Sequence, residues 1–140
     1  MSDRDIRICF VGDSFVNGTG DPEYLGWTGR TCITTARAGY AVTYYNLGIR
    51  GNTNTDIRVR WLQECERRLP PRFDGRIVFS FGVNDTAVEE GKQRLNTAQT
   101  WEHTKFILAE ARSRFPILLV IPPPVANQEN NQRIINSAMG

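Results

Sequence analysis

Residues 6–18 read IRICFVGDSFVNG, and the fold can be worked outward from this stretch. Its apolar half, Ile6 to Val11, has the length and composition of a buried strand. The chain then turns at Gly12 and presents two polar side chains, Asp13 and Ser14. In an open parallel sheet, side chains just past the carboxyl end of a strand face the ligand crevice. We therefore expect Ser14 to lie at a functional site.

Three more strands follow, and helical patterns separate them. The predicted strands cover Ala41 to Leu47, Arg76 to Phe81 and Ile117 to Ile121. Helical patterns run from about Leu25 to Gly39, from Thr53 or Asn54 to Leu69, and from about Leu95 to Arg114. Short aliphatic strands that alternate with helices are typical of a parallel sheet covered on both faces. We expect a single α/β domain over residues 1–140, with a last helix starting near Gln128.

Composition excludes several classes of protein. The chain has 140 residues, 40% hydrophobic and 23% charged, which is ordinary for one globular domain. The net charge is only +2, and the basic residues are dispersed, which argues against a nucleic-acid partner. No stretch approaches the roughly 20 apolar residues of a membrane span. The odd number of cysteines (Cys9, Cys32 and Cys65) lacks metal-like spacing, so we expect buried, reduced thiols and a cytoplasmic protein.

Small and polar residues follow each of the first three strands. Gly12-Asp13-Ser14 follows the first, a loop from Asn46 to Asn52 that includes Gly48 follows the second, and Gly82-Val83-Asn84-Asp85 follows the third. If the sheet is parallel, these loops meet at one edge. A serine hydroxyl, a backbone N–H at a glycine and an asparagine amide are the components of acyl transfer with an oxyanion hole.

These three segments, in this order and each after a strand, resemble the first three blocks of the SGNH hydrolases, also called GDSL lipases/esterases. The resemblance spans residues 6–124. It implies a flavodoxin-like three-layer α/β/α fold with a parallel sheet. It also implies a serine esterase, lipase or acylhydrolase that hydrolyses a small-molecule carboxylic ester through an acyl-serine intermediate, with no metal or cofactor. By the resemblance, Ser14 is the nucleophile, and its own N–H, the Gly48 N–H and the Asn84 side chain form the oxyanion hole. Asp13 and Asp85 would hold the loops.

The last block of that family, Asp-x-x-His, is absent from these residues. That block supplies the general base and the carboxylate that orients it. The single histidine, His103, lies within the long third helical pattern, three residues after Thr100. It points away from a predicted core stripe that includes Trp101 and Leu108, so we interpret it as a surface residue. We expect the domain to be incomplete at its C-terminus.

One alternative function is a non-catalytic module of the same fold that binds an acyl or carbohydrate ligand. Taken alone, Ser14 would be read as a turn residue, and Asp85 as a helix cap or loop tie. Nucleotide binding is disfavoured because the loop from Gly12 to Thr19 lacks the lysine of a phosphate loop, and no Gly-x-Gly-x-x-Gly follows the first strand. No His, Cys or carboxylate cluster has metal-ligand spacing. Acyl specificity and a homo-oligomeric state stay open.

Overall fold

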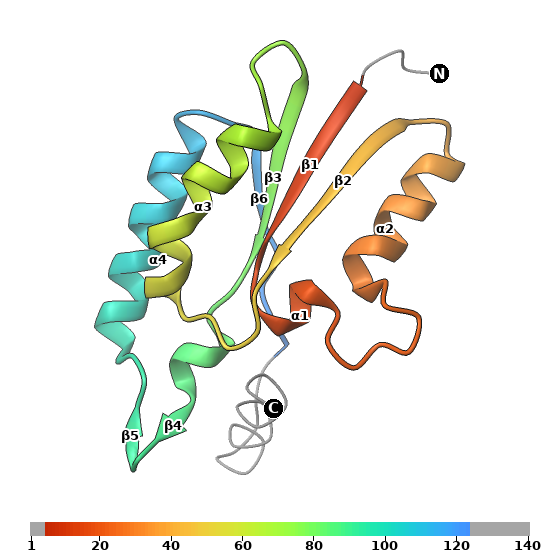
Figure 1. The fold of residues 1–140 in the computed structure, drawn as a ribbon. Helices are drawn as coiled ribbons and strands as arrows, with labels where there is room; N and C mark the ends of the chain where they lie inside the picture. Colours follow the sequence, from red (N-terminus) through yellow and green to blue (C-terminus); the bar gives the residue numbers. More distant parts are fainter. Residues whose placement is uncertain (1–4, 124–140) are drawn as a thin grey trace.

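The computed structural model describes residues 5–123, and the helix expected near Gln128 lies outside this range. The elements in chain order are β1 (Asp5–Gly12), α1 (Ser14–Asn17), α2 (Gly26–Arg37), β2 (Ala41–Gly48), α3 (Asn54–Arg68), β3 (Asp74–Ser80), the 3-10 helix η1 (Val83–Thr86), β4 (Val88–Glu89), β5 (Lys92–Gln93), α4 (Thr97–Arg112) and β6 (Ile117–Leu119). The described residues form a four-stranded sheet in the order β2-β1-β3-β6, and every pairing is parallel. Helices α3 and α4 lie on one face of this sheet, and α1 and α2 on the other (Figure 1).

This architecture confirms the predicted fold class of a parallel α/β sheet covered by helices. The four predicted strands are present, with bounds that differ by one or two residues. Three short features were not predicted. Helix α1 begins at Ser14 itself, and the 3-10 helix η1 and a small antiparallel hairpin of β4 and β5 lie between β3 and α4.

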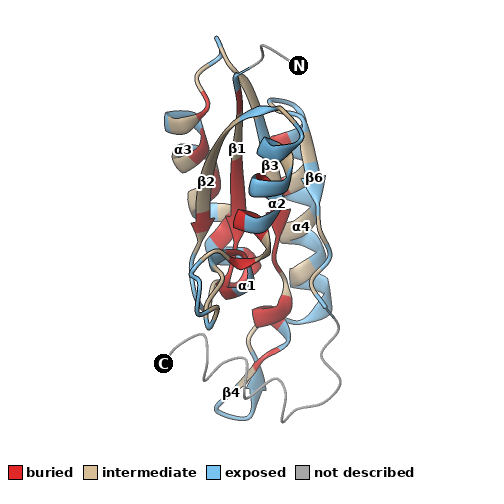
Figure 2. Cartoon of the chain, turned by 90° about the vertical axis from the view of Figure 1, so that its right-hand side faces the viewer, coloured by how far each residue is buried: buried red, intermediate tan, exposed pale blue. Residues whose placement is uncertain are grey.

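Two apolar clusters hold the layers together, and the central strand β1 is largely buried (Figure 2). The larger cluster packs α3 and α4 on the sheet and includes Trp61, Ile77, Phe79 and Ile107. The smaller packs α1 and α2 on the other face, around Phe10 and Val16. Cys9, Cys32 and Cys65 are buried and free, as predicted. Among the described residues, no helix is both long enough and apolar enough to cross a membrane.

Helix α4 packs on the sheet through a face turned slightly from the predicted core stripe. Leu108 of that stripe packs against the core, as predicted. Trp101, also expected in the core, is instead 61% exposed, and Ile107 is fully buried. Polar contacts explain the difference. The Thr100 hydroxyl donates to Asp85 Oδ2 at 2.8 Å, and the Thr104 hydroxyl accepts from Asn54 Nδ2 at 2.8 Å. These two contacts turn the helix so that its next apolar position on that side, Ile107, faces the sheet.

Candidate active site

Ser14 lies where β1 passes into α1. Gly12 ends the strand, and a Cβ at this position would lie 2.0 Å from the Ser80 carbonyl oxygen, so only glycine fits. Asp13 caps α1 because its Oδ1 accepts a hydrogen bond from the Phe15 N–H at 3.0 Å. Ser14 is the first helical residue, a position whose N–H has no partner within its helix. Its hydroxyl makes no hydrogen bond to any residue in the range 5–123, and the residue is 8% exposed.

Gly48 packs directly against the Ser14 turn. It pairs in register with Gly12, and a Cβ on Gly48 would lie 2.3 Å from the Asn17 nitrogen and 2.7 Å from the Asp13 carbonyl oxygen. A side chain is therefore excluded here. The Gly48 N–H already donates to Asn46 Oδ1 at 2.9 Å. Gly48 thus shapes the site, and its N–H is engaged in this structure.

Gly51, in the same loop, is a second glycine whose N–H could act as a donor, and the sequence analysis did not select it. Its φ is +77°, a left-handed conformation that favours glycine. Within residues 5–123, no hydrogen bond engages its N–H. The next residue, Asn52, accepts a hydrogen bond through its carbonyl from Asn84 Nδ2 at 2.9 Å. The sequence does show this second glycine, three residues after Gly48, and a donor role could have been considered for both.

Asn84 and Asp85 lie in η1, just past the carboxyl end of β3, and both are buried. The Asn84 amide nitrogen reaches the loop after β2, as described, while its Oδ1 is buried without a partner among the described residues. Asp85 accepts from the Asn54 N–H and from the Thr100 hydroxyl, both at 2.8 Å. Asp85 therefore joins the starts of α3 and α4 to the end of β3. The predicted convergence of the three loops is what the structure shows.

Both aspartates of the site have a raised pKa. Burial away from water raises the pKa of Asp13 from its ordinary 3.8 to about 6, against the lowering effect of the Phe15 N–H; the nearby Asp85 charge raises it further. Its Oδ2 is buried and has no partner in residues 5–123. Burial also raises the pKa of Asp85, while its two hydrogen bonds lower it. The carboxyl edge of the sheet is thus a poorly hydrated environment in which charge is costly.

His103 makes its contacts on α3, and its charge partly offsets the burial that raises the pKa of Asp85. Its Nε2 is 3.3 Å from the Thr55 hydroxyl and its Nδ1 is 3.2 Å from the Arg58 guanidinium, both on α3. It makes no hydrogen bond to Ser14. The part of the chain that the structure describes has no group of three or more His, Cys, Asp or Glu side chains that could hold a metal ion.

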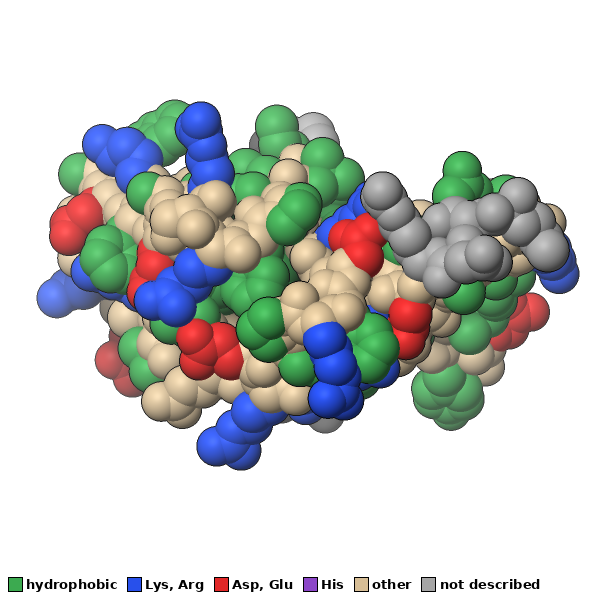
Figure 3. All heavy atoms as spheres, turned by 90° about the horizontal axis from the view of Figure 1, so that it is seen from above, with side chains coloured by type: hydrophobic (Ala, Val, Ile, Leu, Met, Phe, Trp, Pro, Cys, Tyr) green, Lys and Arg blue, Asp and Glu red, His purple; other side chains and the backbone are tan. Residues whose placement is uncertain are grey.

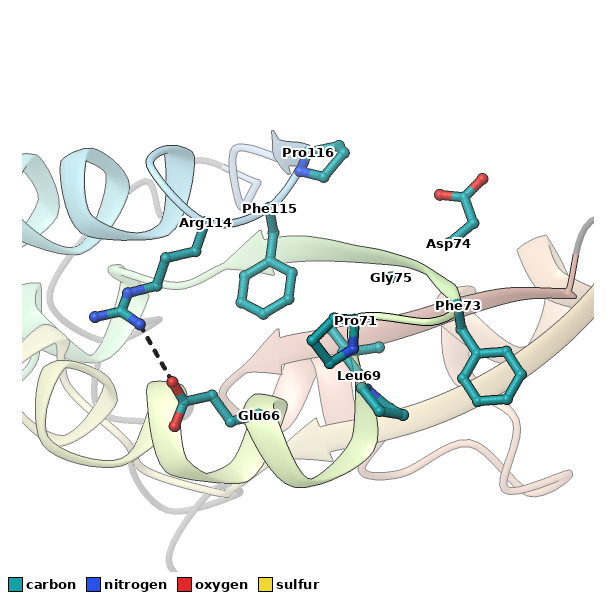
Figure 4. A pocket seen from close by; sticks show the side chains of 10 residues that line it. Glu66, Leu69, Pro71, Phe73, Asp74, Gly75, Arg114, Phe115 and Pro116 are labelled. Carbon is teal, nitrogen blue, oxygen red and sulfur yellow. Dashed lines mark hydrogen bonds and ion pairs between the residues drawn. The ribbon is translucent and has the colours of Figure 1, made fainter.

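The opposite, amino edge of the sheet has a different character. Viewed from that end, basic and acidic side chains are interspersed over the surface (Figure 3). A hollow of about 630 Å³ opens there between the ends of α3 and α4 and the start of β3. Leu69, Pro71 and Phe115 line it, and an ion pair between Arg114 and Glu66 lies at one side (Figure 4). None of the predicted site residues lies in this hollow.

Solved structures with a similar fold include esterases and a lipase/acylhydrolase. The esterase AlinE4, of the SGNH-hydrolase family, superposes with a TM-score of 0.68 at 22% identity, over 96% of this chain and 70% of that one. A lipase/acylhydrolase from Enterococcus faecalis gives 0.63 at 21%, over 95% and 69%. The acetylxylan esterase Axe2 from Geobacillus stearothermophilus, as a catalytic mutant, gives 0.64 at 18%, over 99% and 73%. At these identities the likeness establishes the fold alone.

Curated protein sequences contain no match to this chain. A family model, however, matches nearly all of it. The model describes the GDSL-like lipase/acylhydrolase family and covers residues 10–138, which include every candidate residue discussed above. This membership supports a hydrolase of the esterase type. The chain belongs to the GDSL-like lipase/acylhydrolase family.

Proposed function

We propose that this protein hydrolyses carboxylic esters through an acyl-serine intermediate on Ser14. The observation that carries the proposal is the Ser14 hydroxyl, which has no hydrogen-bond partner in residues 5–123 and lies at the carboxyl end of β1. Serine Oγ attacks the acyl carbon, and the alkoxide leaving group departs with a proton. Water then attacks the acyl-serine and releases the acid, which regenerates the hydroxyl.

An oxyanion hole would be formed by donors from the three loops that meet at the carboxyl edge of the sheet. The Ser14 N–H is unpaired at the start of α1, and the Asn84 amide carries a second hydrogen beyond the one it gives to Asn52. For a third donor, the geometry favours the Gly51 N–H, because Asn46 engages the N–H of Gly48. The Gly48 N–H can act as an oxyanion donor only if the Asn46 side chain moves away from it. Each such donor is worth a factor of about 100 to 1,000 in rate.

The proton of the Ser14 hydroxyl needs an acceptor, and no described residue is bonded to it. This observation supports a second candidate function, a module that binds an acyl or carbohydrate ligand in the same crevice without cleaving it. The two candidates differ in whether Ser14 reacts with an electrophile. They also differ in their response to an added base, since a base in solution accelerates acylation only where a nucleophile is in place.

The test is labelling of the full chain with a fluorophosphonate, followed by peptide mass mapping, with and without added imidazole. We expect modification of Ser14, faster with imidazole and absent in Ser14→Ala. Thr19→Ala is the matched control, because it removes a nearby hydroxyl that, among the described residues, bonds only Asn17. Asn84→Ala should slow labelling about 100-fold. A folded protein that stays unlabelled even with imidazole would contradict the esterase and favour the binding module.

A further inference from the structure

Arg60 lies on α3, and its guanidinium reaches the carboxyl ends of β1 and β2. Its Nη2 donates to the Gly12 carbonyl at 2.8 Å, and its Nη1 donates to the Leu47 carbonyl at 2.9 Å. Its Nε donates to Asn52 Oδ1 at 2.7 Å. Nη1 is also 3.1 Å from Glu64 Oε2, one turn along the same helix. One side chain therefore bonds two strand ends and the loop that follows β2.

The three acceptors other than Glu64 lie next to groups of the proposed site. The Gly12 carbonyl directly precedes the Asp13-Ser14 turn and also accepts the Ile49 N–H at 3.0 Å. The Leu47 carbonyl belongs to the peptide unit that ends in the Gly48 N–H. Asn52 follows Gly51, and its carbonyl accepts the Asn84 amide. The nucleophile turn and the loops bearing the proposed donors thus share one anchor.

The surroundings of Arg60 fit an arginine and no other cation. The side chain is 14% exposed, and three of its four acceptors are neutral oxygens on different segments. A planar guanidinium presents five donors in a rigid fork, whereas a lysine ammonium is a compact point charge on a flexible stem. Glu64 alone would satisfy an arginine on the surface of α3. The remaining bonds serve to hold separate parts of the backbone at set positions.

We propose that Arg60 is a positioning residue for acyl transfer at Ser14. Its guanidinium holds the Ser14 turn, the end of β2 and the Asn52 loop in one arrangement, so that the oxyanion donors are in place before an ester binds. Donors that need no reorganisation during the reaction are the ones that lower its barrier most. This role rests on the proposed esterase function. Arg60 acts through the backbone and does not touch the ester.

The test compares Arg60→Lys with Arg58→Lys in the full chain. Arg58 is a matched control on the same helix, since it also joins two elements, lying 3.6 Å over the Phe106 ring and 3.8 Å from Glu102, both on α4. Labelling of Ser14 is followed over a series of fluorophosphonate concentrations. We expect Arg60→Lys to lower the maximal labelling rate about 10- to 100-fold, because small displacements of reacting groups have effects of that size. The half-saturating concentration should stay within about twofold, the outcome for an interaction that acts only in the transition state.

Equal slowing by the two lysine variants, or a change confined to the half-saturating concentration, would overturn the proposal. Hydrogen exchange of backbone amides in residues 47–53 is an independent readout. We expect exchange to be faster in Arg60→Lys than in Arg58→Lys, at temperatures where both variants are equally far from unfolding. If Ser14 of the wild-type protein does not react with the fluorophosphonate, the proposed esterase function is contradicted. Amide hydrogen exchange then decides by itself whether Arg60 holds these loops. Unchanged exchange would show that it does not.

Discussion

Arg60 and Arg114 each lie beside a glutamate of helix α3, at 3.1 Å from Glu64 and 3.3 Å from Glu66, but at opposite ends of the sheet. The Arg60 side chain is 14% exposed and extends past its glutamate to strand ends and a loop. The Arg114 side chain is 47% exposed, and within residues 5–123 it bonds only Glu66. The two pairs are alike in residue type, although Arg60 and Glu64 are one turn apart on α3 and Arg114 and Glu66 are 48 residues apart in the chain.

The difference shows what each edge of the sheet requires. An exposed ion pair gains little, because water screens it and two long side chains lose freedom. A buried polar group costs free energy unless it is hydrogen-bonded, so the loss of its partner matters far more than at the surface. At the carboxyl edge, the largely buried Arg60 and Asp85 side chains bond segments distant in sequence. At the amino edge, the Arg114–Glu66 pair is exposed to water. Substitutions at either edge test this difference.

Asp85→Ala should have the largest effect, a loss of about 4 kcal/mol in the free energy of unfolding. It leaves two buried donors, the Asn54 N–H and the Thr100 hydroxyl, without their acceptor. Asp85→Asn is the matched control and should lose no more than about 2 kcal/mol, because it keeps one acceptor oxygen and the Thr100 hydroxyl can rotate to accept. Urea denaturation measures both. Equal losses in the two variants would show that the carboxyl edge depends on charge and not on bonding.

Gly48→Ala should cost about 3 kcal/mol, at the upper end of the range for overpacking, because its Cβ meets backbone that cannot rotate away. Gly20→Ala is the comparison. At Gly20 the backbone is left-handed, with a φ of +87°, which disfavours any side chain. An added Cβ would nevertheless have no atom of the described residues within 4 Å. Its cost should be about 1 kcal/mol from the left-handed conformation alone. Thermal unfolding measures the stability of both variants. Similar losses would show that close contact with the backbone is not the reason for glycine at position 48.

Asp13→Asn should stabilise the protein at neutral pH. The pKa of Asp13 is about 6 in the folded protein against 3.8 in an unfolded chain, so the folded state binds the proton more tightly. Its contribution to stability is therefore complete below about pH 4 and is lost as the pH rises through about 6. Asparagine keeps the oxygen that caps α1 and does not titrate. We expect its effect to be more favourable at pH 7 than at pH 4 by about 2 kcal/mol, from the free energy of one pKa unit. Denaturation at both pH values measures this, and a pH-independent effect would contradict the raised pKa.

Arg114→Met should change the free energy of unfolding by less than about 0.5 kcal/mol, as for other exposed pairs. Arg60→Met should destabilise by at least about 2 kcal/mol, because it removes the bonds to the Gly12 and Leu47 carbonyls and to the Asn52 side chain at a poorly hydrated edge. Chemical denaturation in low and high salt measures the free energy of unfolding of both variants. A loss at Arg114 that approaches the loss at Arg60 would remove the distinction between the two edges.

The sequence was sufficient to predict the sheet and the place of the site. Aliphatic strands alternating with helices define a parallel α/β fold, and in such a fold the residues after each strand meet at one edge. The sequence alone therefore identifies candidate site residues at strand ends, namely Ser14, Asn84 and Asp85, because a position just after a strand is a local property of the sequence. Their catalytic roles stay predictions, to be tested by labelling.

Properties that depend on side-chain contacts between distant segments could not be predicted. The orientation of α4 is set by Asp85 and Asn54 holding two threonines, and no periodicity in the helix itself indicates this. The choice between Gly48 and Gly51 depends on where the Asn46 side chain turns. The reach of Arg60 to Gly12, 48 residues away, left no local pattern either.

That long reach has a consequence for how the protein folds. The Asn54–Asp85, Asn52–Asn84 and Gly12–Arg60 bonds join residues 31, 32 and 48 apart in the chain. Closing such loops is entropically unfavourable until strands β1, β2 and β3 are paired, so these bonds form late in folding. Ser14 is near the N-terminus and is synthesised early, yet its surroundings are completed only by residues made much later. A partly folded chain therefore carries the serine without its proposed oxyanion hole, and reactivity of Ser14 should appear together with the native sheet.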